Sequence, residues 1–120
     1  MSVSIARIYG YGRAEGSRTV LVDRLWPRGV SREEVPFDSW MKQVAPSTEL
    51  RKWYAHVQDR FSEFADLYGR ELTEDPARQG LEELREMSRK ADLVLLTATK
   101  DIEHSAAAVL LKLLTATGHQ

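Results

Sequence analysis

The pattern of apolar positions places two buried strands far apart along the chain. Residues 19–22 and residues 93–96 form short, nearly unbroken apolar runs, which are typical of strands buried on both faces of a parallel sheet. Residues 3–9 instead mix β-branched and polar side chains in near alternation, which predicts an edge strand with one partly exposed face. The loop that follows, residues 10–17, is short for a crossover and suits a hairpin equally well, so the orientation of this first strand stays open.

Helical patterns fill the segment between the two apolar runs and follow the second run. The predicted helices begin near Asp38, Ser47, Asp59, Asp75 and Asp101. The last four of these residues are expected to cap the amino ends of their helices, and Pro76 suits a first helical position. Together these elements predict an α/β fold: a small three-layer domain with a short, mainly parallel sheet flanked by about five helices.

Length and composition narrow the class of protein. A chain of 120 residues buries one modest core, so we expect a single domain spanning residues 1–120. Its 17 basic and 18 acidic residues nearly cancel, which argues against a dedicated nucleic-acid coat or a polybasic membrane anchor. The absence of cysteine excludes disulfides, thiolate catalysis and cysteine-ligated zinc. Since the chain shows no signal-peptide pattern and no apolar run long enough to span a bilayer, we expect a cytoplasmic protein without membrane contact.

Arginine is concentrated in the first third of the chain. Only two acids, Glu15 and Asp23, lie among the six arginines of this region: Arg7, Arg13, Arg18, Arg24, Arg28 and Arg32. A solvated arginine face is the default interpretation, because exposed charge is the norm. The alternative is a region that attracts anions.

Basic residues also follow both buried strands directly. Arg24 and Arg28 come after the first strand, and Lys100 and His104 come after the second. In parallel sheets, ligands bind beyond the carboxyl ends of the strands, where loops and helix amino ends gather. If the two strands are parallel, these four side chains open onto one edge of the sheet and form an electropositive concavity.

Each candidate residue has a functional and a structural interpretation. Arg24 and Arg28 offer planar forks that suit phosphate or carboxylate, and structural ion pairing, for example with Asp23, is the alternative. Asp101 serves either as a helix cap or as the partner of a catalytic histidine. His104 is expected in the first turn of the last helix, where the positive helix end disfavours protonation. It serves there either as a base or as a structural histidine.

No metal or cofactor is expected. The three histidines, His56, His104 and His119, are far apart in the sequence, and magnesium held by Asp23 and Asp101 is the one conceivable arrangement. The glycine pattern matches neither a phosphate loop nor a dinucleotide-binding motif.

Three blocks of sequence, taken together, are specific to one family. They are residues 22–29 (VDRLWPRG), residues 45–54 (APSTELRKWY) with His56, and residues 100–104 (KDIEH). In these blocks the chain closely resembles the YeaO-like family of small bacterial proteins, a domain of unknown function, and the match covers most of the chain in order. The resemblance implies that the matching residues gather around one pocket: Arg24, Trp26, Arg28, Trp53, His56, Lys100, Asp101 and His104.

The chain departs from the family pattern in ways that leave the substrate open. Thr97 stands where an aromatic residue is usual, Ser105 stands where asparagine is usual, and the glycine-rich loop from Gly10 differs. More distant relatives carry cysteines around the segment equivalent to residues 97–104. This chain has none, so a thiol mechanism cannot operate here.

The leading hypothesis is a protein that binds a small anionic ligand, phosphorylated or carboxylated, at the carboxyl ends of the strands. The candidate ligand-binding residues are Asp23, Arg24, Trp26, Arg28, Trp53, His56 and Lys100. The candidate catalytic residues are His104, which would transfer a proton, and Asp101, which would support it. Two alternatives stay open: a nucleic-acid-binding module in which Trp26 or Trp53 stacks on bases, and a partner-binding domain without catalysis. Neither the oligomeric state nor enzymatic activity follows from the sequence.

Overall fold

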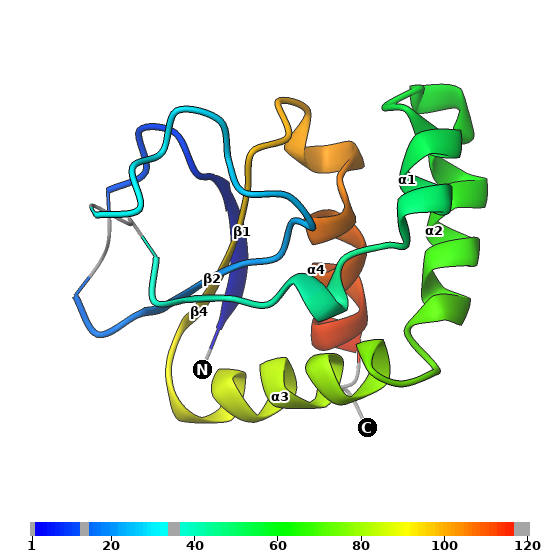
Figure 1. Cartoon of the computed structure of the whole chain (residues 1–120). Coiled ribbons are helices and arrows are strands. Elements are labelled where there is room, and N and C mark those ends of the chain that lie inside the picture. Colours follow the sequence, from blue (N-terminus) through cyan, green and yellow to red (C-terminus); the bar gives the residue numbers. More distant parts are fainter. Residues whose placement is uncertain (1, 13–14, 34–36, 117–120) are drawn as a thin grey trace.

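A computed structural model describes residues 2–12, 15–33 and 37–116 of the chain. Its strands form one sheet in the order β1-β4-β2-β3. Figure 1 labels three of them, β1, β4 and β2. The strands are β1 (Val3–Arg7), β2 (Arg18–Leu21), β3 (Ser39–Trp40) and β4 (Leu93–Thr97). Every neighbouring pair is parallel, which confirms the predicted α/β class and parallel sheet. The first strand lies at an edge, as predicted, and its orientation is parallel.

The described residues hold four α-helices and three short 3-10 helices. The α-helices are α1 (Thr48–Tyr54), α2 (Phe61–Glu71), α3 (Ala77–Lys90) and α4 (Ala106–Ala116). The 3-10 helices are η1 (Lys42–Val44), η2 (Gln58–Arg60) and η3 (Ile102–His104). The number of α-helices thus differs slightly from the predicted five. None of the helices in these ranges is long and apolar enough to cross a membrane.

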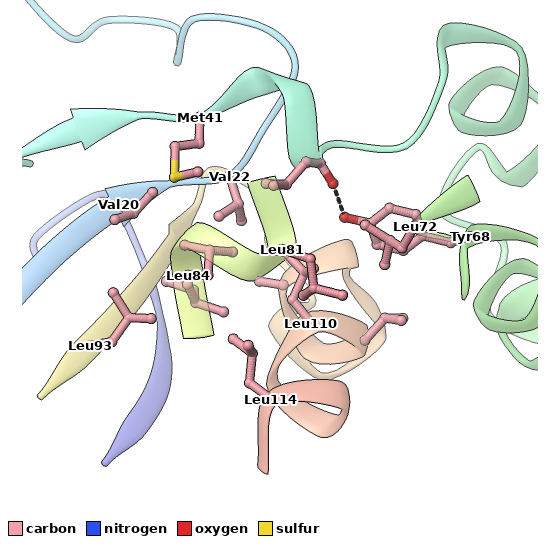
Figure 2. Close-up of a cluster of buried hydrophobic side chains, with 14 of the residues drawn as sticks. Val20, Val22, Met41, Tyr68, Leu72, Leu81, Leu84, Leu93, Leu110 and Leu114 are labelled. Carbon is pink, nitrogen blue, oxygen red and sulfur yellow. Dashed lines mark hydrogen bonds between the residues drawn. The ribbon is translucent and has the colours of Figure 1, made fainter. Parts of the chain in front are cut away.

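The two faces of the sheet are covered by different kinds of structure, helices on one and loop segments on the other. Val20 and Leu95 belong to the larger core cluster, part of which is drawn in Figure 2, and all four α-helices contribute buried side chains to that cluster. Leu21 and Leu96, their neighbours in the strands, belong to a second cluster with Phe37 and aromatic residues of the segment between β2 and β3. The helices therefore cover one face, and a loop layer rich in aromatic side chains covers the other.

A buried tyrosine ties α2 to η1. Tyr68 is fully buried, and its hydroxyl donates a hydrogen bond to the backbone carbonyl of Val44, drawn as a dashed line in Figure 2. Burial raises the pKa of the Tyr68 hydroxyl well above its usual range, so this group remains a donor. Helix α3 packs on the same turn so closely that a Cβ added at Gly80 would collide with the Val44 side chain. These contacts fix η1, which leads directly to α1.

The helix predicted from Asp38 does not begin there, because residues 39–40 form β3 and only the 3-10 helix η1 follows before Pro46. The Asp38 N–H donates to the Thr19 carbonyl at 2.9 Å, and the Met41 N–H donates to the Leu21 carbonyl at 2.9 Å. The Asp38 carboxylate also accepts from the Thr19 N–H at 2.9 Å. The segment therefore adds strand β3 to the sheet, because hydrogen bonds to a distant strand outweigh a weak local preference for helix.

Of the four predicted helix caps, only Ser47 is confirmed. Its hydroxyl accepts a hydrogen bond from the Leu50 N–H at 3.1 Å at the start of α1. Asp59 and Asp75 do not cap, because α2 and α3 begin beyond them at positions without a side-chain cap bond. Asp75 instead forms an ion pair of 3.1 Å with Arg78, in the first turn of α3.

Asp101 and His104 precede the last helix instead of opening it. Helix α4 begins at Ala106, and the Ser105 hydroxyl accepts from the Ala108 N–H at 3.3 Å. Asp101 lies before η3 without a side-chain cap bond, and His104 ends η3. His104 therefore does not lie in the first turn of the last helix, contrary to the prediction.

Candidate functional site

A pocket of about 440 Å³ lies at the carboxyl ends of β2 and β4. Its lining includes residues 22–28 after β2, Arg51, Tyr54 and His56 of α1 and the following turn, Ala98 and Thr99 after β4, and Ser105 and Ala106 before and in α4. We refer to it as the strand-end pocket. Its position is the one where α/β sheets commonly bind ligands, because the loops that follow parallel strands converge there.

Asp23 joins the two strand ends beneath the pocket. One carboxylate oxygen accepts a hydrogen bond from the Thr97 hydroxyl at 2.7 Å, and the other accepts from the Ala98 N–H at 2.7 Å. Burial raises the pKa of Asp23, although both hydrogen bonds and the nearby His56 act in the opposite direction. Both oxygens of this carboxylate therefore already accept hydrogen bonds from the protein.

The Arg24 side chain donates hydrogen bonds to backbone carbonyls. Its Nε donates to the Pro46 carbonyl at 2.9 Å, and an Nη donates to the Ala45 carbonyl at 3.3 Å. These bonds hold the segment after β2 against the turn that leads into α1. The Arg24 guanidinium brings positive charge to the pocket, while its directional hydrogen bonds serve the fold.

Three other basic side chains line the pocket without a side-chain hydrogen bond or ion pair to a described residue. Arg28, Arg51 and His56 form no side-chain hydrogen bond or ion pair with any described residue, although all three line the same pocket. Arg51 is the clearest case, because its Nε is buried and has no hydrogen-bond partner among the described residues. A buried donor without an acceptor is costly, and Arg85 on α3 has a buried Nε of the same kind.

Helix α1 is held at both ends, which fixes Arg51 and His56. At its start, the Ser47 N–H and hydroxyl donate to the two carboxylate oxygens of Glu71 at 2.8 and 2.6 Å. At its end, Ala55 and His56 both adopt left-handed backbone conformations, with φ of 47° and 58°. Such conformations are costly for residues other than glycine and recur at binding sites. Here they turn the chain so that His56 lines the pocket.

The structure brings some of the sequence-predicted site residues together and separates others. Asp23, Arg24, Trp26, Arg28 and His56 line the strand-end pocket. Trp53, Lys100, Asp101 and His104 are not among its lining residues.

The separated pair Asp101 and His104 forms a small polar cluster of its own. The His104 Nδ1 lies 2.9 Å from an Asp101 carboxylate oxygen, and the Gln58 amide donates to the same oxygen at 2.7 Å. The bond from Gln58, together with that from His104, holds the pKa of Asp101 below its usual value. The His104 ring stands edge-on to Phe61, with ring centres 5.1 Å apart. The cluster contacts the pocket residue Tyr54, whose hydroxyl donates to the His104 carbonyl at 2.6 Å, and Ser105, the residue after His104, also lines the pocket.

The two predicted tryptophans have different surroundings. The Trp26 ring N–H donates to the Val30 carbonyl at 2.8 Å, and Arg32 lies over the ring, 4.3 Å from its centre. Trp26 is thus a fixed wall of the pocket. Trp53 is exposed and lies away from the pocket, with Arg60 over its ring at 5.3 Å. Lys100 is also exposed.

Sequence reasoning missed Arg51 and Tyr54 as pocket residues. Tyr54 follows Arg51 by three residues on α1, so the two share a helix face. That spacing, in a block that also holds His56, was the available signal.

The described residues contain no group of three histidine, aspartate or glutamate side chains arranged to hold a metal ion. Asp23 accepts hydrogen bonds from Thr97 and Ala98, and Asp101 accepts one from Gln58. His119 lies outside the described residues.

Comparison with known proteins identifies the family. A family model described as "Inactive DUF488-N3 subclade" matches residues 2–120. The chain belongs to this DUF488-N3 subclade. The predicted YeaO-like resemblance is confirmed, since this DUF488-N3 protein is 34% identical over 111 residues to the uncharacterized protein YeaO of Escherichia coli. That match covers 92% of this chain and 94% of YeaO.

A mycobacterial relative of the DUF488-N3 protein is more similar. The uncharacterized protein Rv3073c of Mycobacterium tuberculosis is 42% identical over 112 residues, which cover 93% of this chain and 92% of the relative. No solved structure matches the chain significantly. Because these relatives are themselves named as uncharacterized, the function must be argued from the site.

Proposed function

We propose that this DUF488-N3 protein binds a small anionic ligand in the strand-end pocket. The observation that carries the proposal is Arg51, which lines the pocket and whose buried Nε has no hydrogen-bond partner among the described residues. An anionic oxygen in the pocket would accept a charge-assisted hydrogen bond from the Arg51 guanidinium, which is stronger than a neutral hydrogen bond.

The charge of the pocket supports the same conclusion. Arg24, Arg28, Arg51 and His56 line it, and the acid that accompanies them, Asp23, already accepts hydrogen bonds from Thr97 and Ala98. Like charges gathered in one concavity repel each other, and a bound anion relieves that repulsion. Arginine also suits phosphate and carboxylate geometrically, because its planar fork offers paired donors.

The geometry favours binding over proton transfer by His104. The His104 side chain pairs with Asp101 and does not line the pocket, so it would not reach a ligand held by Arg28 and Arg51. The description of the subclade as inactive supports a binding role as well. We therefore propose ligand binding without assigning a reaction.

A thermal-shift screen of the full chain tests this proposal. Phosphate, sulfate, small carboxylates, sugar phosphates and short oligonucleotides are compared for the wild type and the Arg51→Gln variant. We expect one class of small anion to stabilise the wild type, because a ligand that binds the folded state raises its stability. Loss of the Arg51 hydrogen bond is expected to weaken its binding about ten- to hundredfold.

Arg85→Gln is the matched control. Arg85 also has a buried Nε without a hydrogen-bond partner, but it lies on α3, outside the pocket, and pairs with Glu82. The control variant should bind the anion as the wild type does. The proposal is wrong if no small anion binds, or if both variants lose binding equally. Stabilisation by oligonucleotides alone, weakening steeply with salt, would replace it with the nucleic-acid alternative.

A further inference from the structure

The neutral polar groups of the strand-end pocket are largely engaged within the protein. The Tyr54 hydroxyl donates to the His104 carbonyl at 2.6 Å, and the Ser105 hydroxyl donates to the Ile102 carbonyl at 2.6 Å. The Asp23 carboxylate accepts from Thr97 and Ala98, as described above. The donors left for a ligand are the Thr99 hydroxyl and the side chains of Arg28, Arg51 and His56, and the three basic side chains suit an anionic group rather than a chain of hydroxyls.

The rest of the lining is apolar and partly exposed. Leu25, which lines the pocket, is 59% exposed, more than any other large hydrophobic residue among those described. Tyr9, another lining residue, is 38% exposed. Trp26, Phe64 and Ala106 add further apolar surface. Exposed apolar surface that lines a concavity is typical of a binding site, because a ligand covers it.

The size of the pocket exceeds what a simple anion needs. A volume of about 440 Å³ falls within the range of sites that hold organic ligands, which begins at about 300 Å³. Inorganic phosphate or sulfate would occupy the basic part and leave the apolar walls in contact with water.

We infer that the ligand is an anion with an apolar body, such as an aryl or short acyl phosphate or carboxylate, in preference to a polyhydroxylated sugar phosphate or sugar acid. This inference rests on the proposed anion-binding function. The anionic group binds Arg28, Arg51 and His56, and the apolar body covers Leu25 and packs against Trp26. A sugar in the same place would lose water from several hydroxyls and find few free partners for them.

Calorimetric titration of the full chain tests the inference with matched ligands. The first set is phenyl phosphate, ribose 5-phosphate and inorganic phosphate. The second set is benzoate, gluconate and acetate, in case the pocket prefers carboxylates. In the set that binds, we expect the aryl ligand to bind about tenfold more tightly than the other two, because burial of one ring face contributes about that factor.

The Leu25→Ser variant locates the apolar contact. Since Leu25 is 59% exposed, its replacement leaves the core intact. We expect Leu25→Ser to reduce the affinity for the aryl ligand several-fold and to leave the affinity for phosphate or acetate unchanged. Val57→Ser is the control, because Val57 is 40% exposed and does not line the pocket.

The outcomes separate the inference from the proposed function. If the sugar ligand binds as tightly as the aryl ligand, or if Leu25→Ser has no effect, the pocket binds anions without selecting an apolar body and the inference is wrong. If none of the six ligands binds, the proposed function fails and the inference fails with it.

Discussion

The hydroxyl of Thr97 donates a hydrogen bond of 2.7 Å to Asp23 and so connects the carboxyl end of β4 to the segment that follows β2. The Asp23 carboxylate is largely buried, and burial raises its pKa. This carboxylate therefore holds the floor of the pocket together and also makes the stability of the fold depend on pH.

Asp23 should make the protein less stable as its carboxylate ionises in the folded state. Its folded-state pKa lies above the unfolded-state value, so the folded form binds more protons between the two values. The free energy of unfolding is therefore expected to fall as the pH rises from the unfolded-state pKa through the folded-state pKa. Asp23→Asn should remove this component of the pH dependence, and urea unfolding at a series of pH values from about 3 to 7 measures it.

Asp23→Asn also loses one of these hydrogen bonds, because an amide cannot accept from both Thr97 and Ala98 through its two terminal atoms. This loss of about 1 kcal/mol is increasingly offset as the pH rises, because the variant avoids the cost of ionising the buried carboxyl. Asp66→Asn, at an exposed position of α2, provides the control. An unchanged pH profile in Asp23→Asn would show that another group sets the dependence.

Gly80 should not tolerate a methyl group. A Cβ at this position of α3 would collide with the Val44 side chain, which is fully buried in η1. We expect Gly80→Ala to lower the free energy of unfolding by about 1–3 kcal/mol, the usual cost of overpacking. Gly69→Ala is a direct contrast, because Gly69 lies inside α2 with no other atom near the added group. The free energy of unfolding of Gly69→Ala should rise by up to about 1 kcal/mol. Urea unfolding of both variants measures these changes, and a stabilising Gly80→Ala would contradict the prediction.

The strained end of α1 should be relieved by glycine. Ala55 has a φ of 47°, a left-handed conformation that costs an alanine about 1 kcal/mol relative to glycine. Ala55→Gly is therefore expected to raise the thermal midpoint by a few degrees, which calorimetry measures. In contrast, Ala91 ends α3 with an extended φ of −160°, so Ala91→Gly should lower the midpoint. Two variants that shifted the midpoint in the same direction would contradict this account.

Gln58 should control the titration of Asp101. Its amide donates to the Asp101 carboxylate at 2.7 Å, and this bond is the largest cause of the lowered Asp101 pKa. We expect Gln58→Ala to raise the Asp101 pKa toward its usual value, which an NMR titration of the carboxyl carbon follows. The lowered pKa contributes stability above the unfolded-state pKa that is lost as the pH falls through the folded-state value, so the variant should be less stable above that range and lose less on acidification. Gln79→Ala, on α3, serves as the control, and an unchanged Asp101 pKa in Gln58→Ala would contradict the assignment.

The sequence was most informative where the signal was local. The apolar runs at residues 19–22 and 93–96 became β2 and β4, and Ser47 caps α1 as its position suggested. Asp38 was misread because its structure depends on hydrogen bonds to Thr19, a residue of a distant strand. The residues around Asp38 in the sequence do not indicate that this segment pairs with β2.

In the candidate site, too, residues indicated by the local sequence were predicted, and residues placed by distant contacts were missed. Asp23, Arg24 and Arg28 were selected because they follow a strand directly, and all three line the pocket. The spacing of Arg51 and Tyr54 shows that they share a helix face, but the sequence does not show that α1, which the bonds between Ser47 and Glu71 hold to α2, lies beside the strand ends. His104 was misplaced because the last helix begins two residues after it, and the residues before that helix form a separate turn.

The order of strands in the sheet has a consequence for biosynthesis. Strand β4 lies between β1 and β2 but is made last, so the ribosome releases both outer segments well before the strand that unites them. Until then the nascent chain carries an edge strand with nothing to pair with, and the helices have no complete surface on which to pack. The residues beyond β4 that line the strand-end pocket emerge later still. The strand-end pocket can therefore form only after β4 and the lining residues that follow it have been synthesised.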